Sequence, residues 1–418
     1  MRKHSAYHVY LALQAASSFL LSMIFTASSV YQVIMAELTP LQLVLVGTTL
    51  EVTIFIFEIP TGVVADVFSR RLSVVIGWLL IGMGFIVEGS FPYFAPILLA
   101  QVLWGLGYTF TSGATEAWIS DEIGESQAGK AFLRASQIGL LAALLGIFAG
   151  MGLGSIQVNL PVQLGGAGLV LVGVVSGFLM PETNFSPAVS RIRGAWKHMF
   201  GAFLQGLNLI RGRPQLMHIL GIGFIYGLYS EGFDRLWTKH ILDNFEMPMF
   251  MDFQPIVWIG IIRGAGMLLA AGLTEIARRK IVTDQFNSVA KALFFLTLLL
   301  SMGLFAFALG QSFWLVIGAY WLISVTRDII GPVYTAWVNQ RLDSKVRATV
   351  LSMSGQVDAV GQILGGPGVG IIGNVVSVRV ALLVSGIILT PTLPLYQRVM
   401  KTFSNQGSVT QEKISDDA

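Results

Sequence analysis

Long apolar segments alternate with short polar connections along most of the chain. Each segment spans about 20 or more residues, the length that an α-helix needs to cross the hydrocarbon core of a bilayer. The pattern predicts an all-α integral membrane protein with twelve transmembrane helices. They lie at 9–36, 43–65, 72–91, 96–118, 132–155, 162–181, 215–238, 254–276, 287–309, 312–336, 348–374 and 376–398.

The first segment follows Arg2 and Lys3, as the apolar part of a secretory signal peptide does. It is far longer than the roughly 7–15 apolar residues of such a signal. We therefore interpret it as a retained helix.

Composition supports the membrane class and excludes several kinds of chemistry. Only 12% of the residues are charged and the mean hydropathy is +0.71, whereas soluble domains are about 25% charged. The chain has no cysteine, and its five histidines form no HExxH spacing, so disulfides, thiolate ligands and a zinc hydrolase site are excluded. We expect that the chain is not an enzyme and that it binds neither a metal nor a cofactor.

Basic residues collect in alternate connections. With the N-terminus inside, 21 of the 26 Lys and Arg residues fall in cytoplasmic segments, as the positive-inside rule requires. This bias predicts a multi-pass protein of the cytoplasmic (plasma) membrane with both termini in the cytoplasm. The net charge of +3 then reflects topology, and nothing in it indicates a nucleic-acid partner.

The longest polar connection divides the chain into two halves of six helices. We predict an N-terminal bundle at 1–181, a cytoplasmic linker at 182–214, a C-terminal bundle at 215–403 and a flexible tail at 404–418. Apolar residues at helical spacing between Trp196 and Leu207, with Arg193 and Lys197 among them, indicate a helix on the inner membrane face. A linker without such a helix is the alternative.

The two halves resemble each other at an offset of 219 residues. The pairs are Ala117 and Trp118 with Ala336 and Trp337, Gln137 with Gln356, Leu145 and Gly146 with Leu364 and Gly365, and Gly154 with Gly373. Two parallel six-helix repeats about an axis normal to the membrane are typical of transporters.

The connection between the second and third predicted helices reads EIPTGVVADVFSRR (58–71). It resembles the G-x-L-A-D-R-x-G-R-R pattern of the major facilitator superfamily, with departures at Val67 and Ser69. The matching residues are Gly62, Val64, Ala65, Asp66, Arg70 and Arg71.

The resemblance implies the major facilitator fold, with two six-helix pseudo-repeat bundles. It also implies that Asp66 caps the helix that begins near Ala348, and that Arg70 bridges to Asp121. The residues expected at this cytoplasmic gate are Gly62, Asp66, Arg70, Arg71, Glu116, Asp121, Glu275 and Arg279. The alternative is that these charges only flank tight loops.

Three further stretches resemble the drug:proton antiporters of the tetracycline-resistance type. They are TSGATEAWISDE (111–122), EGFDRLW (231–237) and GQVDAVGQILGGPGVG (355–370). Gln101 replaces the family's Arg four residues before Gly105. In the fifth helix Gly146, Gly150, Gly152 and Gly154 only partly match the family's glycine pattern, and its proline is absent.

Two carboxylates lie inside the second predicted helix. Glu51 and Glu58 are seven residues apart and so share a face, about 10 Å apart along the axis,. The predicted helices of this half contain no Lys or Arg between Lys3 and Arg70. Because hydrocarbon disfavours a charged carboxylate, each acid is expected to hold a proton, to meet a base from the other half or to bind a cationic substrate. Glu58 reaching the inner surface as a structural acid is the alternative.

The C-terminal half carries acids and bases together. Arg327 and Asp328 are sequence neighbours that do not face each other on a helix, and Asp358 and Arg263 lie at compatible depths. These four form either a structural network or part of a substrate site. Glu231, Asp234 and Arg235 are interpreted as an outer gate or a helix-end pair. Further cavity candidates are Phe55, Gln101, Trp104, Tyr108, Tyr226, Tyr320 and Trp321.

These patterns predict a monomeric transporter that uses protons, contacts membrane lipids and exports small amphipathic molecules or drugs by alternating access, with Glu51 and Glu58 as proton-coupling candidates. An uptake symporter for a nutrient and a lipid or lysolipid transporter share the fold and remain alternatives. The two-bundle repeat disfavours a channel.

Overall fold

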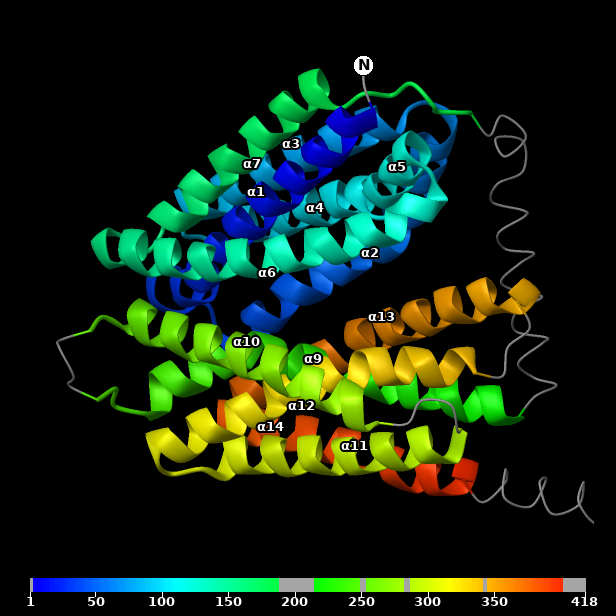
Figure 1. Cartoon of the computed structure of the whole chain (residues 1–418). Coiled ribbons are helices and arrows are strands. Elements are labelled where there is room, and N and C mark those ends of the chain that lie inside the picture. The colour runs from blue at the N-terminus through cyan, green and yellow to red at the C-terminus, as the bar shows by residue number, and fades with distance from the viewer. Residues whose placement is uncertain (1–2, 188–213, 249–252, 282–285, 341–343, 401–418) are drawn as a thin grey trace, which may run out of the picture. The chain divides into compact units, whose positions relative to one another are not determined.

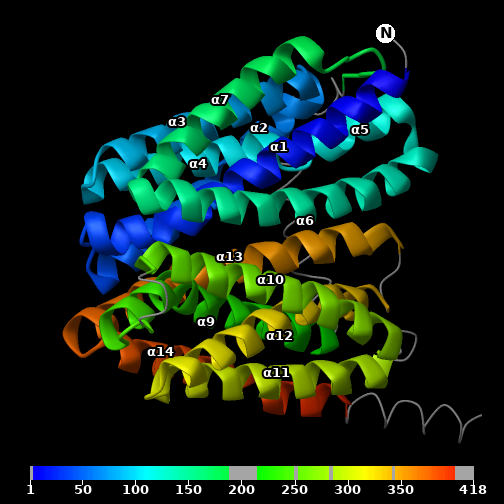
Figure 2. The ribbon, with the colours of Figure 1, turned by 60° about the vertical axis from the view of Figure 1, so that its left-hand side comes forward.

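The computed structural model describes residues 3–187, 214–248, 253–281, 286–340 and 344–400. Most of the predicted linker and all of the predicted tail lie outside these residues. Helices account for all the regular structure in the described part (Figures 1 and 2).

The helices of the first half follow the predicted segments closely. They are α1 (Lys3–Val30), η1 (Tyr31–Met35), α2 (Pro40–Val67), α3 (Arg70–Ser90), α4 (Phe94–Thr111), α5 (Ala114–Ile123), α6 (Glu125–Ile156) and α7 (Leu160–Leu179). The element η1 is a short π-helix that continues α1. The single helix predicted at 96–118 is divided into α4 and α5, because Gly113 adopts a left-handed conformation with φ of 71°.

The helices of the second half correspond to the predicted segments with two differences. They are α9 (Pro214–Asn244), α10 (Pro255–Lys280), α11 (Phe286–Leu309), α12 (Phe313–Asn339), α13 (Ser344–Val375) and α14 (Val378–Leu389). Helix α9 runs past its predicted end at 238, and the last predicted segment is divided by a turn at residues 390–391, after which residues 392–400 are helical again.

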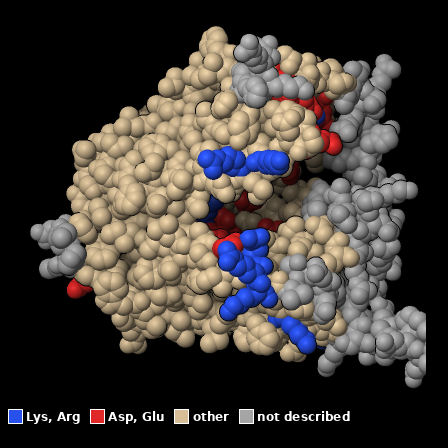
Figure 3. Space-filling model, viewed as in Figure 1, with Lys and Arg blue, Asp and Glu red and all other residues tan. Residues whose placement is uncertain are grey.

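Ten helices within the described residues are long and apolar enough to cross a membrane. The predicted spans at 215–238 and 348–374 correspond to α9 and α13, which are long enough but fall outside these ten. Four charged residues, Glu231, Asp234, Arg235 and Lys239, lie in the second half of α9. Uncharged residues form most of the face visible in Figure 3, and Lys, Arg, Asp and Glu occupy only a small part of it.

The chain divides into two compact units. Unit 1 comprises Met1–His198 with Glu246–Gly264, and unit 2 comprises Met199–Phe245 with Ala265–Ala418. In unit 1, α1 packs on α6 and α7, α3 packs on α4 and α7, and α2 packs on α4. In unit 2, α9 packs on α13 and α14, and α11 packs on α12 and α14.

Each unit contains an equivalent close contact between two of its own helices, and the glycines that form the two contacts are separated by the predicted offset of 219 residues. A Cβ at Gly146 of α6 would lie 2.1 Å from the backbone O of Phe19 on α1, and one at Gly365 of α13 would lie 2.2 Å from the backbone O of Leu228 on α9. Only glycine permits either approach, because no other residue leaves room for its side chain. The glycine identities therefore mark equivalent positions in the two units.

The start of α2 has a complete cap. The Thr39 hydroxyl accepts a hydrogen bond from the Gln42 backbone N–H at 3.3 Å, and the Gln42 side chain accepts one from the Thr39 N–H at 2.9 Å. Pro40 occupies the first helical position. This capping box satisfies donors that would otherwise lack partners at the helix end.

Thr39→Ala is expected to lower the free energy of unfolding by about 1 kcal/mol, because one cap acceptor is lost. Thermal unfolding of the purified protein in detergent measures the change, and Thr39→Ser, which keeps the hydroxyl, is the control. Equal stability of the Ala variant and the wild type would contradict the assigned cap.

Candidate functional site

A cavity of about 420 Å³ lies inside unit 2, between α9, α12 and α13. Its size is typical of sites that enclose small organic molecules. It is lined by Gly223, Tyr226, Tyr229, Ser230, Asp234, Arg327, Ile330, Gly331, Tyr334, Thr335, Ser354, Gly355, Asp358 and Gln362. Three residues singled out from the sequence as cavity candidates, Tyr226, Arg327 and Asp358, are thus brought together.

An ion pair joins α9 to α12 within this cavity. The two terminal nitrogens of Arg327 donate to the two carboxylate oxygens of Asp234, at 2.5 and 2.8 Å. Such a bidentate pair fixes geometry as well as charge. The guanidinium carbon also lies 6.0 Å from the centre of the Phe233 ring.

This pair was not expected from the sequence. Arg327 was expected to join Asp328, Asp358 and Arg263 in a structural network or a substrate site, and Asp234 was interpreted as part of an outer gate or a helix-end pair. Asp234 instead lines the cavity, because α9 continues to Asn244, about 9 Å beyond the predicted end at 238. Its position is therefore about 15 Å from the end of the helix.

Asp358 has a neutral partner. Its Oδ2 accepts a hydrogen bond from the side-chain amide of Gln362, one turn further along α13, at 2.8 Å. Among the residues that the structure describes, no Lys or Arg lies within ion-pair distance of Asp358. The cavity therefore holds one acid paired with a base and one acid bound to an amide.

Tyrosine rings form much of the remaining wall. The Tyr226 hydroxyl lies 2.5 Å from the Thr297 hydroxyl, and the Tyr334 hydroxyl donates to the backbone O of Ile219 at 2.9 Å. Tyr226 and Tyr229 pack edge to face with ring centres 5.7 Å apart. Tyr229 and Tyr334 were missed from the sequence; the three-residue spacing of Tyr226 and Tyr229, which places both on one face of α9, was the available signal for Tyr229,.

The other expected residues of the second half lie elsewhere. Asp328 is exposed on α12 and does not line the cavity, and Arg263 belongs to unit 1. Glu231 and Arg235 form an ion pair of 2.9 Å within α9. Tyr320 is buried against Trp237, with ring centres 4.5 Å apart. Trp321 is half-buried on α12 and also lies outside the lining.

The α2 acids and the nearby aromatic candidates lie in unit 1. Glu51 is half-buried and Glu58 is exposed on the same helix. The Phe55 side chain is 41% exposed and Tyr108 of α4 is 46% exposed. Trp104 packs between other rings, 5.2 Å from the centres of both Phe25 and Phe85.

A buried carboxyl group on α3 was not singled out from the sequence. Glu88 is 0% exposed. Its Oε1 accepts hydrogen bonds from the Ser28 hydroxyl at 2.5 Å and the Gln32 amide at 2.9 Å, and its Oε2 accepts one from the Gln101 amide at 3.2 Å. The Tyr31 hydroxyl donates to the backbone O of Glu88 at 2.7 Å. Gln101, expected in a substrate cavity, is instead 1% exposed and part of this network.

The π-helix explains how these donors meet. Ser28 lies in the last turn of α1, and Tyr31 and Gln32 open η1, so the junction of the two helices presents three donors to Glu88. Such π-helical turns are often found at functional sites. The hydrophobic pattern of this turn is that of an ordinary α-helix, so the π-helix could not be predicted from the sequence.

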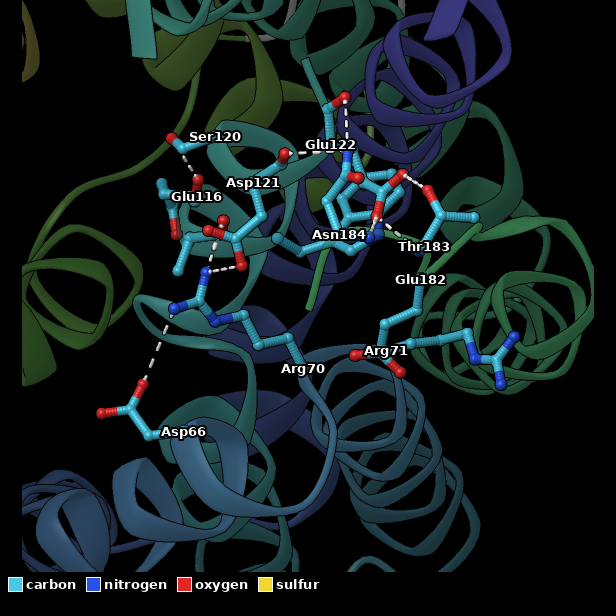
Figure 4. Close-up of polar contacts among 12 residues, drawn as sticks. Asp66, Arg70, Arg71, Glu116, Ser120, Asp121, Glu122, Glu182, Thr183 and Asn184 are labelled. Atoms are coloured by element: carbon cyan, nitrogen blue, oxygen red, sulfur yellow. Dashed lines mark hydrogen bonds and ion pairs between the residues drawn. The ribbon is translucent and has the colours of Figure 1, made fainter. Parts of the chain in front are cut away.

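The connection between α2 and α3 forms a polar cluster (Figure 4). Arg70 donates to the Asp121 carboxylate and, at 2.7 Å, to the backbone O of Ala117, and it lies 4.0 Å from Asp66. The structure thus brings Arg70 and Asp121 together, as the resemblance implies. The side chain of Ala348 lies outside the described side chains and in the other unit, so the cap expected from Asp66 stays a prediction.

Two further acids of this cluster hold the chain after α7. Glu182 accepts hydrogen bonds from the Ser69 hydroxyl at 2.6 Å and the Arg71 backbone N–H at 3.0 Å. The buried Glu122 accepts from the backbone N–H groups of Thr183 and Asn184, at 2.7 and 3.0 Å. The first residues of the predicted linker are therefore fixed to unit 1.

The remaining gate candidates are Glu116, Glu275 and Gly62, and the hydrogen bonds of the two acids are to residues of their own helices. The backbone O of Glu116 accepts from Ser120, and its side chain is exposed. Glu275 binds Arg278 and Arg279 one turn further along α10, both at 2.8 Å. Gly62 faces open space, since a Cβ there would meet no atom within 4 Å.

No protein-family profile matches the chain. It is 25% identical over 381 residues to an uncharacterised transporter of the major facilitator type, YxaM of Bacillus subtilis (strain 168), covering 89% of this chain and 91% of that protein. The structure is similar to that of the nucleoside transporter NupG, with a TM-score of 0.75, 14% identity and coverage of 96% and 99% of the two chains.

A bacterial homologue of the human lysosomal transporter Spinster, captured inward-facing and occupied, gives a TM-score of 0.74 at 13% identity, covering 95% of this chain and 97% of that one. These relatives are transporters and not enzymes, in agreement with the expectation that the chain is not an enzyme. The chain therefore has the major facilitator fold and is a multi-pass membrane protein related to transporters of the major facilitator type.

Proposed function

We propose that the chain exports small amphipathic molecules across the cytoplasmic membrane by proton-coupled alternating access, as a monomer with both termini in the cytoplasm. The cavity in unit 2 carries the proposal. It combines the Asp234 and Arg327 pair, Asp358 and several tyrosine rings. Ionisable residues inside a membrane-spanning bundle are costly and generally mark a substrate or ion pathway.

Proton coupling is assigned to α2 of unit 1. Glu51 and Glu58 lie on nearly one face of this helix, with Glu51 half-buried and Glu58 exposed. The rings of Phe55 and Tyr108 are exposed in the same unit and are proposed to contact substrate. Deprotonation of Glu51 favours loading, and its protonation from the opposite side favours release.

The cluster of Asp66, Arg70 and Asp121 is proposed as the cytoplasmic gate. Its ion pairs are only partly buried, with side-chain exposures of 19% for Arg70 and 31% for Asp121. Such pairs contribute little net stability and can break and re-form, which suits a contact that opens in each cycle.

Uptake of a polar solute is the second candidate. The charged and hydroxyl-bearing wall of the cavity favours it, since most of the lining side chains carry a polar group. The name of one structural neighbour, a nucleoside transporter, points the same way. The direction of proton-driven flux separates uptake from export.

Glu51→Gln is expected to abolish proton-driven transport while leaving membrane insertion intact, because the amide cannot carry a proton. The test uses proteoliposomes with an imposed pH gradient and a panel of fluorescent cationic dyes and tetracycline-like compounds. Glu37→Gln, at an exposed acid before α2, is the matched control. Gradient-driven transport at the wild-type rate in Glu51→Gln would refute the coupling role of Glu51.

A further inference from the structure

The charges that line the cavity do not balance. Its ionisable acids and bases are Asp234, Asp358 and Arg327, so two acids face one base. The guanidinium of Arg327 already donates to both carboxylate oxygens of Asp234, which neutralises this pair. One negative charge is left when Asp358 is ionised.

Asp358 has unused capacity to bind a donor. A carboxylate has about four acceptor positions, and Asp358 uses one for the Gln362 amide. Within the described residues it forms no ion pair. Water or a ligand must supply the remaining donors, because a buried carboxylate without them is costly.

The tyrosine rings favour the same kind of ligand. The hydroxyl groups of Tyr226 and Tyr334 are bonded to Thr297 and to the backbone of Ile219. Their rings are therefore the parts available to an occupant of the cavity. Aromatic rings attract cations through their negative faces, by about 0.5–2 kcal/mol for each contact.

We infer that Asp358 binds the ammonium group of an organic cation, whose apolar part lies against the tyrosine rings. Asp234 neutralises the charge of Arg327. The inference rests on the proposed transport function and names its substrate class. A cavity of about 420 Å³ accommodates an aromatic amine with room for water. Arg327 acts as a positioning residue, since it ties up the second acid.

Three indoles of nearly equal size separate charge from shape. Tryptamine is a cation at neutral pH, tryptophol is neutral and indole-3-acetate is an anion. Binding to the purified full chain is measured by the ligand-dependent rise of its unfolding temperature. Tryptamine is expected to bind roughly 10- to 100-fold more tightly than tryptophol, as a hydrogen-bonded charge contact predicts, and indole-3-acetate more weakly than either. Equal binding of the three, or binding by none, overturns the inference.

Asp358→Asn is expected to remove the preference for tryptamine over tryptophol while keeping tryptophol affinity. The control is Asp243→Asn, which removes an acid of the same helix bundle that pairs with Lys239 outside the cavity. A retained preference in Asp358→Asn overturns the inference. If the wild type transports neutral solutes and shows no preference for cations, the inference is overturned and the proposed function stands. If the wild type binds tryptamine but transports no compound, the result counts against the proposed function.

Discussion

Arg327→Ala is expected to destabilise the protein by about 2 kcal/mol. The change leaves Asp234 without the two hydrogen bonds of 2.5 and 2.8 Å that it now accepts. Removing one member of a fully buried pair costs about 3–5 kcal/mol. The smaller figure applies here because the two side chains are 31% and 40% exposed to the cavity, so water partly replaces the lost partner.

A double-mutant cycle with Asp234→Ala isolates the pair. Arg327→Ala and Asp234→Ala together are expected to cost less than the sum of the single changes, with a coupling free energy of about 1–3 kcal/mol. Chemical unfolding in detergent gives the stabilities, and tryptamine binding gives the functional effect. Additive stabilities would contradict a direct interaction between the two side chains.

Features that depend on local pattern could be predicted from the sequence. The apolar segments predicted the positions of the helices, and the resemblance of residues 58–71 to the major facilitator pattern implied the contact of Arg70 with Asp121. The repeat of glycines at a fixed offset marked equivalent helix contacts, because Gly146 and Gly365 each allow a neighbouring backbone to approach.

Features that depend on the depth of a residue could not be predicted in the same way. Asp234 was expected near a helix end because the apolar part of α9 fades after it, but a helix can continue through charged residues when they meet partners inside the bundle. Asp234 pairs with Arg327, which follows it by 93 positions in the chain. Helical periodicity alone does not identify such a partner.

Glu88 illustrates the same limit. It lies near the end of α3, where a charged residue ordinarily extends to water. Three donors, one each from α1, η1 and α4, instead enclose it. Only the tertiary arrangement of α1, η1, α3 and α4 reveals that this carboxyl is fully buried.

Glu88→Leu is expected to lower the free energy of unfolding by at least about 3 kcal/mol, because the side chains of Ser28, Gln32 and Gln101 lose an acceptor in a buried site. Each buried donor without a partner costs about 1–3 kcal/mol. Leucine has a similar volume, so the loss reports hydrogen bonding and not a cavity. Thermal and chemical unfolding in detergent measure the effect.

Glu88→Gln is the matched variant and is expected to cost only about 1 kcal/mol. Its carbonyl still accepts from Ser28 and Gln32, while its new amide must face Gln101. The Oε1 atom of Gln101 is buried and accepts no hydrogen bond within the described structure, so rotation of the Gln101 amide lets that oxygen accept from the new donor. Equal losses in the Leu and Gln variants would show that the carboxylate charge, not the hydrogen bonding, stabilises the site. A Leu variant more stable than the wild type would instead mean that the cost of burying the carboxyl exceeds what its three hydrogen bonds return.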